Sequence, residues 1–184
     1  QLLALFIGLQ LSAQDAEWTS IKDINPFIGT GGHGHTHPSA QAPFGMIQLG
    51  PNTRYEGWDG CGGYHYTDSA MYGFSCTHLS GTGVSDYGDL LMLPYSSPTK
   101  EGDHIKFFKE DEHAQAGYYA CILDDGTRIE ATAGDRTGIL RIRFGEGSEP
   151  GIMIDLNFRA SLLWPLIIMK RLSATSPSRQ LKTP

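Results

Sequence analysis

The chain has 184 residues, of which 40% are hydrophobic and 18% charged, a composition that fits one globular domain and excludes a disordered chain. Its 23 glycines predict a turn-rich fold and argue against a helical bundle. The net charge of -6 argues against nucleic acid as a partner, because phosphate binding needs a clustered excess of Lys and Arg.

Charge is distributed unevenly along the chain, and the break comes at Arg159. Residues 159–184 contain five basic residues and no Asp or Glu, whereas residues 1–158 contain all 20 acidic residues. The last segment also lacks turn signals and hydrophobic periodicity. We therefore interpret residues 159–184 as an aberrant tail, produced by a frameshift or a truncated gene model.

The N-terminal segment predicts the compartment. Gln1–Gln14 is an apolar run that ends in Ser-Ala-Gln, which is typical of a partial signal peptide and too short for the roughly 20 apolar residues of a membrane span. A buried N-terminal strand is the alternative. We expect an exported protein that is periplasmic, on the cell surface or secreted, with no membrane span. Cys61, Cys76 and Cys121 allow at most one disulfide and show no metal-ligand spacing.

The predicted secondary structure is almost entirely β. Residues 55–89 suit short strands and long loops, because aromatic residues alternate there with Gly, Ser, Thr and Asp. Asp-Gly and Gly-Asp turns predict successive hairpins between residues 116 and 144, and a final strand is expected to complete a meander. The predicted strands are Phe44–Leu49, Asp89–Leu93 (stopped by Pro94), Ala116–Leu123, Thr127–Thr132, Gly138–Phe144 and Gly151–Leu156. We predict an antiparallel β-sandwich whose glycine-rich loops gather at one end or edge.

Chemistry-bearing residues are concentrated between Gly29 and Gly88, where five of the seven histidines and 14 of the 23 glycines lie. Gly29–Gly34 formally matches a dinucleotide-binding fingerprint, but Pro38 and Pro43 follow where a helix should open. The same segment carries three histidines at alternate positions, His33, His35 and His37. In an extended chain they share one side, so they suit either a zinc site or the bracing of loops.

The same half of the sequence contains two further kinds of candidate functional residue, carboxylates and one tryptophan. Glycoside hydrolysis needs two carboxyl groups across a sugar, but Asp residues beside Gly or Ser are also common turn formers. The carboxylates are Glu56, Asp59, Asp68, Asp86 and Asp89. Trp58 is flanked by glycine-rich sequence on both sides, so it is either a ligand platform or a structural plug.

Several long motifs in order resemble the N-terminal domain of glycoside hydrolase family 92 α-mannosidases, over about Trp18 to Phe158. These motifs are Ile24–Gly32 with His33–Pro38, Ala42–Met46, Gln48–Pro51, Gly57–Tyr66, Gly73–Gly83 and Asp86–Asp89. The resemblance implies three regions: a partial leader at 1–14, a β-sandwich N-terminal domain at 18–158 and the tail at 159–184. Beyond Arg159 the sequence no longer resembles the family.

The resemblance also implies a function. Members are exported, mostly bacterial, calcium-dependent, inverting exo-α-mannosidases, in which the sandwich joins a larger (α/α)6 barrel. That barrel carries the general acid, the general base and most calcium ligands, and it is absent here, so the fragment alone is expected to be inactive. The expected substrates are α-1,2-mannosides or N-glycan mannose.

The resemblance assigns this chain to the rim of the active site and to domain packing. Trp58 would stack on the sugar in the leaving-group subsite, with Asp59, Cys61 and Gly62 shaping the pocket. Loop bracing or interface roles fall to His33, His35, His37, His78 and Asp86.

Two other functions remain open from the sequence. A stand-alone carbohydrate-binding module would use Trp58, Tyr64 and Tyr66 as its stacking surface. A cupin-like metalloenzyme would use the three alternating histidines as metal ligands.

Overall fold

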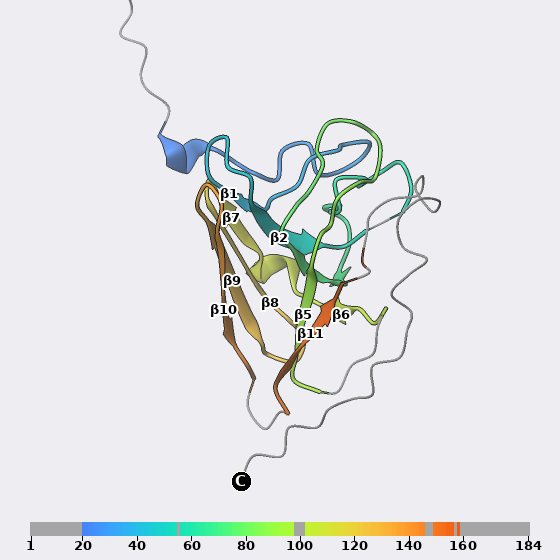
Figure 1. Ribbon diagram of the computed structural model, residues 1–184, viewed down its shortest axis with the longest axis vertical. Coiled ribbons are helices and arrows are strands. Elements are labelled where there is room, and N and C mark those ends of the chain that lie inside the picture. The colour runs from blue at the N-terminus through green and yellow to red at the C-terminus, as the bar shows by residue number, and fades with distance from the viewer. Residues whose placement is uncertain (1–19, 55, 98–101, 146–148, 157, 159–184) are drawn as a thin grey trace, which may run out of the picture.

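Two antiparallel β-sheets face each other across the core of the protein (Figure 1). The computed structural model describes residues 20–54, 56–97, 102–145, 149–156 and 158. The interpretations of residues 1–14 as a leader and of 159–184 as an aberrant tail lie outside these residues. Within them the structure is mostly β, with only two 3-10 helices, η1 (Ile21–Asp23) and η2 (Lys109–Asp111).

The first sheet has five strands in the order β1-β2-β4-β5-β11. Their bounds are β1 Ala40–Gln41, β2 Gln48–Asn52, β4 Gly73–Ser75, β5 Leu91–Tyr95 and β11 Gly151–Asp155. The strand β11 pairs antiparallel with β5 and forms one edge of this sheet. A small separate pair joins β3 (Ala70–Met71) to β6 (Ile105–Lys106).

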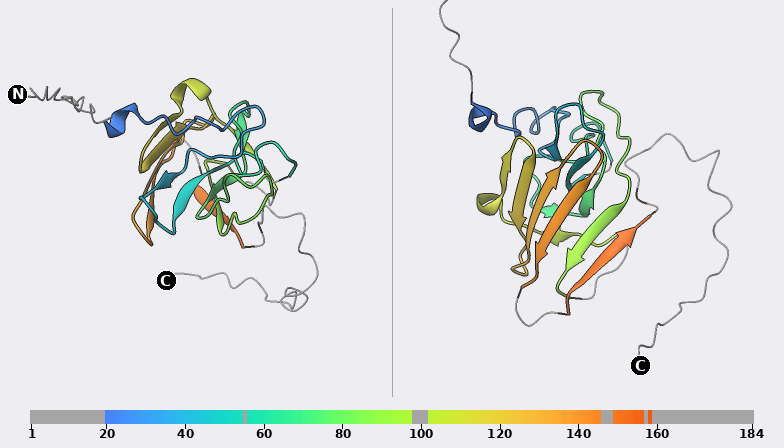
Figure 2. Two further views of the ribbon diagram at one scale, coloured as in Figure 1. Left: turned by 90° about the horizontal axis from the view of Figure 1, so that it is seen from above. Right: turned by 60° about the vertical axis from the view of Figure 1, so that its left-hand side comes forward.

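The second sheet has four strands in the order β10-β9-β8-β7, and each strand pairs with its neighbour in the sequence (Figure 2). Their bounds are β7 His113–Gln115, β8 Tyr118–Ile122, β9 Arg128–Ala133 and β10 Gly138–Arg143. The β8–β9 and β9–β10 turns contain the predicted Asp-Gly and Gly-Asp signals. The hairpins predicted between residues 116 and 144 are therefore confirmed.

The hydrophobic core lies between the two sheets and is contributed by alternate residues of their strands. Leu49 and Phe74 from the first sheet pack with Tyr119 and Ile129 from the second, and all four are buried. The rings of Phe74 and Tyr119 meet edge to face with centroids 5.9 Å apart, a preferred aromatic geometry. This packing confirms the predicted antiparallel sandwich.

Three local expectations were wrong. The segment predicted as the strand Phe44–Leu49 begins with a turn, because Pro43 and Gly45 favour one, and β2 starts only at Gln48. Pro94 does not end its strand. The strand β5 continues through it, because β4 pairs with β5 only at Met92 and leaves one side of Pro94 without a ladder partner.

The third error concerns the last strand. Gly151–Leu156 was predicted to extend the meander, but β11 crosses to the other sheet and pairs with β5, Ile152 opposite Pro94. Turns of two to five residues join the strands of the second sheet, whereas seven residues separate β10 from β11. Such a segment allows the chain to change sheets, which sequence alternation does not reveal.

The loops of the glycine-rich half gather at one end of the sandwich, shown at the top of Figure 1. The backbone hydrogen bonds from Gln48 to Cys76 and from Cys76 to Asp89 place the start of β2, the end of β4 and the start of β5 side by side. We call the loops at residues 24–39, 42–47, 54–66 and 77–90 the loop end.

Candidate functional site

The segment Gly57–Gly63 presents Trp58 to solvent at the loop end. The Trp58 indole is 62% exposed, although tryptophan has the largest side chain of the apolar residues. Gly60 and Gly63 have φ angles of 73° and 93°, and a Cβ on Gly63 would lie 2.7 Å from the Asn52 amide oxygen. Glycine is therefore needed here for both conformation and space. Trp58 is not a structural plug in this chain.

One side of the Trp58 indole is held in place by the neighbouring loops. The His35 ring meets it edge-on, with the two ring centroids 4.8 Å apart. Gly83 approaches so closely that a Cβ there would lie 2.6 Å from the indole. The platform is thus positioned by two contacts while more than half of it stays accessible.

Asp59, next to Trp58, is an ionised hydrogen-bond acceptor. His33 Nδ1 donates to its carboxylate at 2.7 Å, and this hydrogen bond lowers the pKa of Asp59. The His33 side chain is 87% exposed, so this pair lies on the surface. Arg54 Nη1 also donates to the Asp59 carbonyl at 3.4 Å, and the Arg54 guanidinium makes three hydrogen bonds to Asp68.

The underside of the loop is supported by buried histidines. His78 Nδ1 donates to the Gly62 carbonyl at 2.8 Å, and burial lowers the pKa of His78 to about 4, so this ring is neutral at pH 7. His37 stacks on it at 4.7 Å, and burial also lowers the pKa of His37. Cys61 is buried beside Gly62, and burial raises the pKa of its thiol. His37 and His78 thus lie against the inner side of this loop, and Cys61 lies beneath the accessible surface.

Two supports of this loop were missed by sequence reasoning. His65 is buried, and its Nε2 lies 3.0 Å from the Gly32 carbonyl, which connects the Trp58 segment to the segment that carries His33. Tyr64 is fully buried, and its hydroxyl donates to Glu112 at 2.8 Å. The signal for both was their place inside the Gly57–Tyr66 motif, directly after the glycine turn.

Tyr64 is the centre of a buried polar network that connects the loop end to the second sheet. The Glu112 carboxylate also accepts from Tyr119 at 2.7 Å and from Lys109 at 2.8 Å. The Lys109 ammonium lies 4.7 Å from the Tyr64 ring centroid. Burial and the carboxylate raise the pKa of Tyr64. Because Tyr64 is inside, the stacking surface proposed for a binding module is not formed by Trp58, Tyr64 and Tyr66 together.

The alternating histidines do not converge on one point. His33 pairs with Asp59 on the surface, His35 contacts Trp58, and His37 stacks on His78. Over the part of the chain that the structure describes, no group of three or more His, Cys, Asp or Glu side chains could hold a metal ion. This arrangement counts against a cupin-like metal site.

Asp86 and Asp89, two further carboxylates of the loop end, are engaged locally, as turn formers would be. Asp86 is exposed and accepts from the Tyr87 amide at 2.8 Å, and Asp89 accepts from the Thr77 hydroxyl at 2.8 Å. The neighbouring Ser85 hydroxyl donates to the Gly57 carbonyl at 3.5 Å, which ties this loop to the Trp58 segment. Asp59, held by His33, is the carboxylate that directly follows the exposed tryptophan in the chain.

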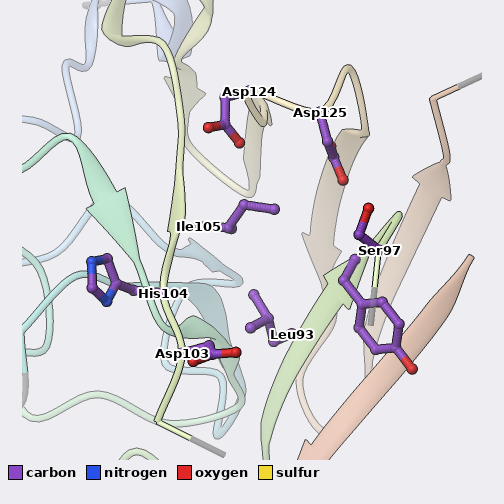
Figure 3. A pocket seen from close by; sticks show the side chains of 8 residues that line it. Leu93, Ser97, Asp103, His104, Ile105, Asp124 and Asp125 are labelled. Atoms are coloured by element: carbon purple, nitrogen blue, oxygen red, sulfur yellow. The ribbon is translucent and has the colours of Figure 1, made fainter. Parts of the chain in front are cut away.

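A second concave feature lies at the opposite end of the sandwich. This open cavity has a volume of about 290 Å³ and is formed by β5, the segment at residues 103–105 and the β8–β9 turn. Asp103 lies across it from Asp124 and Asp125 (Figure 3). Asp125 is tied to the backbone, since its carboxylate accepts from Ser96 at 3.0 Å and Thr127 at 2.8 Å. None of the site residues expected from the sequence lines this cavity.

Comparison with known protein families identifies the family of this chain. Residues 23–170 match the glycosyl hydrolase family 92 N-terminal domain. The chain belongs to this family. The match extends past Phe158, where we placed the domain boundary, to residue 170.

Solved family 92 enzymes share the fold. A family GH92 α-mannosidase from Bacteroides thetaiotaomicron has a TM-score of 0.73 and 38% identity, over 77% of this chain and 21% of that one. An inverting mannosidase of the family from the same species has a TM-score of 0.66 and 27% identity, over 73% of this chain and 19% of that one.

A curated relative comes from a different organism. An uncharacterized secreted glycosidase of Arthroderma benhamiae is 28% identical over 171 residues, which is 84% of this chain and 22% of that protein. This family 92 chain therefore spans about a fifth of the length of the relatives it matches. In the described residues, no helix has the length and hydrophobicity needed to cross a bilayer.

Proposed function

We propose that this chain is the N-terminal domain of an exported, exo-acting, inverting α-mannosidase and that its loop end forms part of the active-site rim. The observation that carries this proposal is Trp58, an exposed indole held by two loop contacts inside a family 92 domain. The relatives' names support the activity: one is an α-mannosidase also solved in complex with mannoimidazole, and another is an inverting mannosidase.

Trp58 would supply an apolar face for a mannose ring in the leaving-group subsite. Aromatic faces stack on the apolar faces of sugars, and the contacts with His35 and Gly83 reduce the ordering cost on binding. Asp59 would accept hydrogen bonds from sugar hydroxyl groups. Its lowered pKa keeps it ionised, which suits an acceptor and excludes it as the general acid at neutral pH.

The acid and base would come from the rest of the parent protein. Inversion needs a carboxylic acid that protonates the glycosidic oxygen and a carboxylate that activates water, about 6.5–9.5 Å apart. Three described carboxylates of the loop end, Asp59, Asp86 and Asp89, are instead engaged with His33, a turn amide and Thr77. Hydrolysis by this chain without the (α/α)6 barrel is therefore not expected.

Calcium dependence remains a proposal about the parent enzyme. The described residues do not offer a cluster of carboxylates or histidines that fits a metal ion. Calcium prefers six to eight oxygen ligands, and we assign that site to the missing barrel. Export is also proposed, and the secreted glycosidase among the relatives supports it.

The test uses the longer parent enzyme with Trp58→Ala and Trp58→Phe. Truncation to Ala should lower kcat/KM for an α-1,2-mannobioside at least roughly tenfold, whereas Phe should restore most of the loss, because a flat apolar face remains. The melting temperature should stay within about 1 °C, since the indole is largely exposed. Unchanged kcat/KM in the Ala variant would contradict the rim role.

A binding module that works alone is the second candidate, favoured only by the exposure of Trp58 in this chain. Calorimetric titration of the 184-residue chain with mannobiose distinguishes the binding module from the domain of a larger enzyme. Measurable affinity without hydrolysis supports the module, and absence of binding supports a domain that is incomplete without its barrel.

A further inference from the structure

The loop that carries Trp58 is closed at its base by hydrogen bonds between its two ends. The Gly63 carbonyl accepts from the Thr53 amide at 2.8 Å. The Thr53 hydroxyl in turn accepts from the His65 amide at 2.9 Å, and both Thr53 and His65 are buried. Residues 54–63 therefore leave and re-enter the domain at one place, which we call the loop base. Any side chain that fixes the loop base also fixes the frame in which Trp58 is held.

Tyr64 connects the loop base to a buried carboxylate. It lies between Gly63 and His65, its side chain is fully buried, and its hydroxyl donates to Glu112 at 2.8 Å. The Lys109 ammonium donates to the same hydroxyl at 2.7 Å and to the Glu112 carboxylate at 2.8 Å. Hydrogen bonds in which one partner is ionised are shorter and stronger than those between neutral groups. The Tyr64 hydroxyl is therefore held from both sides.

Aromatic rings enclose the Lys109 ammonium and restrict its position. It lies 4.7 Å from the centroids of the Tyr64 and Phe107 rings and 5.1 Å from the centroid of the Tyr66 ring. Each distance is within the range of a cation–π interaction. Phe107 is buried in the core between the two sheets. The group that holds Tyr64 is thus itself fixed to the hydrophobic core.

A second tyrosine binds the same carboxylate from the other side of the network. Tyr119 in β8 is also fully buried, and its hydroxyl donates to Glu112 at 2.7 Å. Its ring packs in the core against Phe74. Tyr64 and Tyr119 therefore match in burial and in their hydrogen-bond acceptor. They differ in the part of the chain that they hold, which is the loop base for Tyr64 and the second sheet for Tyr119.

We propose that Tyr64 is a positioning residue for Trp58. Held by Lys109 and Glu112, it fixes the loop base in the orientation that lets the indole meet a sugar. The inference rests on the proposed function, because this orientation affects hydrolysis only if Trp58 contacts the substrate. The Tyr64 hydroxyl is buried, so it acts through the backbone of the loop. A change at Tyr64 therefore alters the kinetics only by way of Trp58.

The first experiment needs no sugar and uses the 184-residue chain with its other two tryptophans replaced by phenylalanine. Tyr64→Phe and Tyr119→Phe each remove one donor from Glu112 and keep the ring, so similar losses in melting temperature are expected. Only Tyr64→Phe should increase the acrylamide quenching of Trp58 and the fast component of its fluorescence anisotropy decay. Equal quenching and equal anisotropy in the two variants would overturn the proposal.

A second variant keeps the proposal testable if Tyr64→Phe does not fold. Lys109→Met removes the other hydrogen bond to the Tyr64 hydroxyl and leaves an unbranched apolar chain among the rings. It should change the quenching and the anisotropy of Trp58 in the same direction as Tyr64→Phe. Values equal to those of the unsubstituted chain would count against the proposal.

The second experiment is a double-mutant cycle in the parent enzyme. Tyr64→Phe should lower kcat/KM for an α-1,2-mannobioside at least about twofold, the lower end of the coupling between residues of one network, whereas Tyr119→Phe should not. In a Trp58→Ala background, Tyr64→Phe should have no further effect, because the residue through which it acts is gone. The same loss in both backgrounds would overturn positioning through Trp58. If Trp58→Ala alone leaves kcat/KM unchanged, the proposed function fails, and the fluorescence comparison still decides whether Tyr64 positions the indole.

Discussion

The contact between Gly83 and Trp58 can be tested with a matched pair of substitutions. Gly83 and Gly81 have φ angles of 71° and 79°, so alanine at either position carries roughly 1–2 kcal/mol of backbone strain. They differ in what an added Cβ meets. At Gly83 it would lie 2.6 Å and 2.8 Å from two indole carbons, whereas at Gly81 it meets nothing within 4 Å. We expect similar losses of stability, but only Gly83→Ala should displace the indole.

The size of the displacement follows from the same distances. Carbon atoms pack at about 3.5–4.0 Å, so a Cβ at 2.6 Å forces the indole to move by about 1 Å. Such a shift of a positioned binding group can cost up to a hundredfold in rate. In a Trp18→Phe, Trp164→Phe background, Gly83→Ala should change the emission maximum and acrylamide quenching of Trp58, and in the parent enzyme it should lower kcat/KM. Identical spectra for the two alanine variants would show that Gly83 does not set the position of the indole.

Two further predictions concern the buried polar supports. Glu112→Gln should lower the free energy of unfolding by roughly 3 kcal/mol in urea titrations, because the 2%-exposed carboxylate binds Lys109 and two tyrosine hydroxyls. Acid should destabilise the domain between about pH 6.5 and 4: the unfolded chain protonates His78 in this range, whereas the folded pKa is about 4. The change of the free energy of unfolding with pH in this range should be smaller in His78→Gln than in the wild type. It should be unchanged in His113→Gln, which alters an exposed position. A wild-type stability that does not vary with pH in this range would contradict the assignment.

The second sheet could be predicted from sequence because its order is local. Each of its strands pairs with its chain neighbour, and Asp-Gly and Gly-Asp turns mark the reversals. The first sheet joins β2 to β4 and β5 to β11, which are distant in sequence. No residue pattern specifies such pairings, and a proline in the middle of β5 actively suggests that the strand ends there.

At the site, the resemblance directed attention to Trp58 and its neighbours, but the roles of individual residues could not be read from residue type. Three histidines at alternate positions looked equivalent in sequence. In the structure one pairs with Asp59 on the surface, one orients the indole and one is stacked inside. What separates them is burial, and burial depends on how the loops at 54–66 and 77–90 fold over the segment, which is tertiary information.

The density of glycine and histidine at the loop end has a physical reason that is independent of catalysis. Long loops contribute few apolar side chains, so their backbone polar groups must be satisfied by other means when they are packed together. Glycines such as Gly63 let two chain segments come close, and neutral rings such as His78 fill the space beside them while donating to a loop carbonyl. Tyr64 and Glu112 tie this polar layer to the apolar core between the sheets. A loop end built this way holds the exposed Trp58 in a defined position, which is the property that an active-site rim requires.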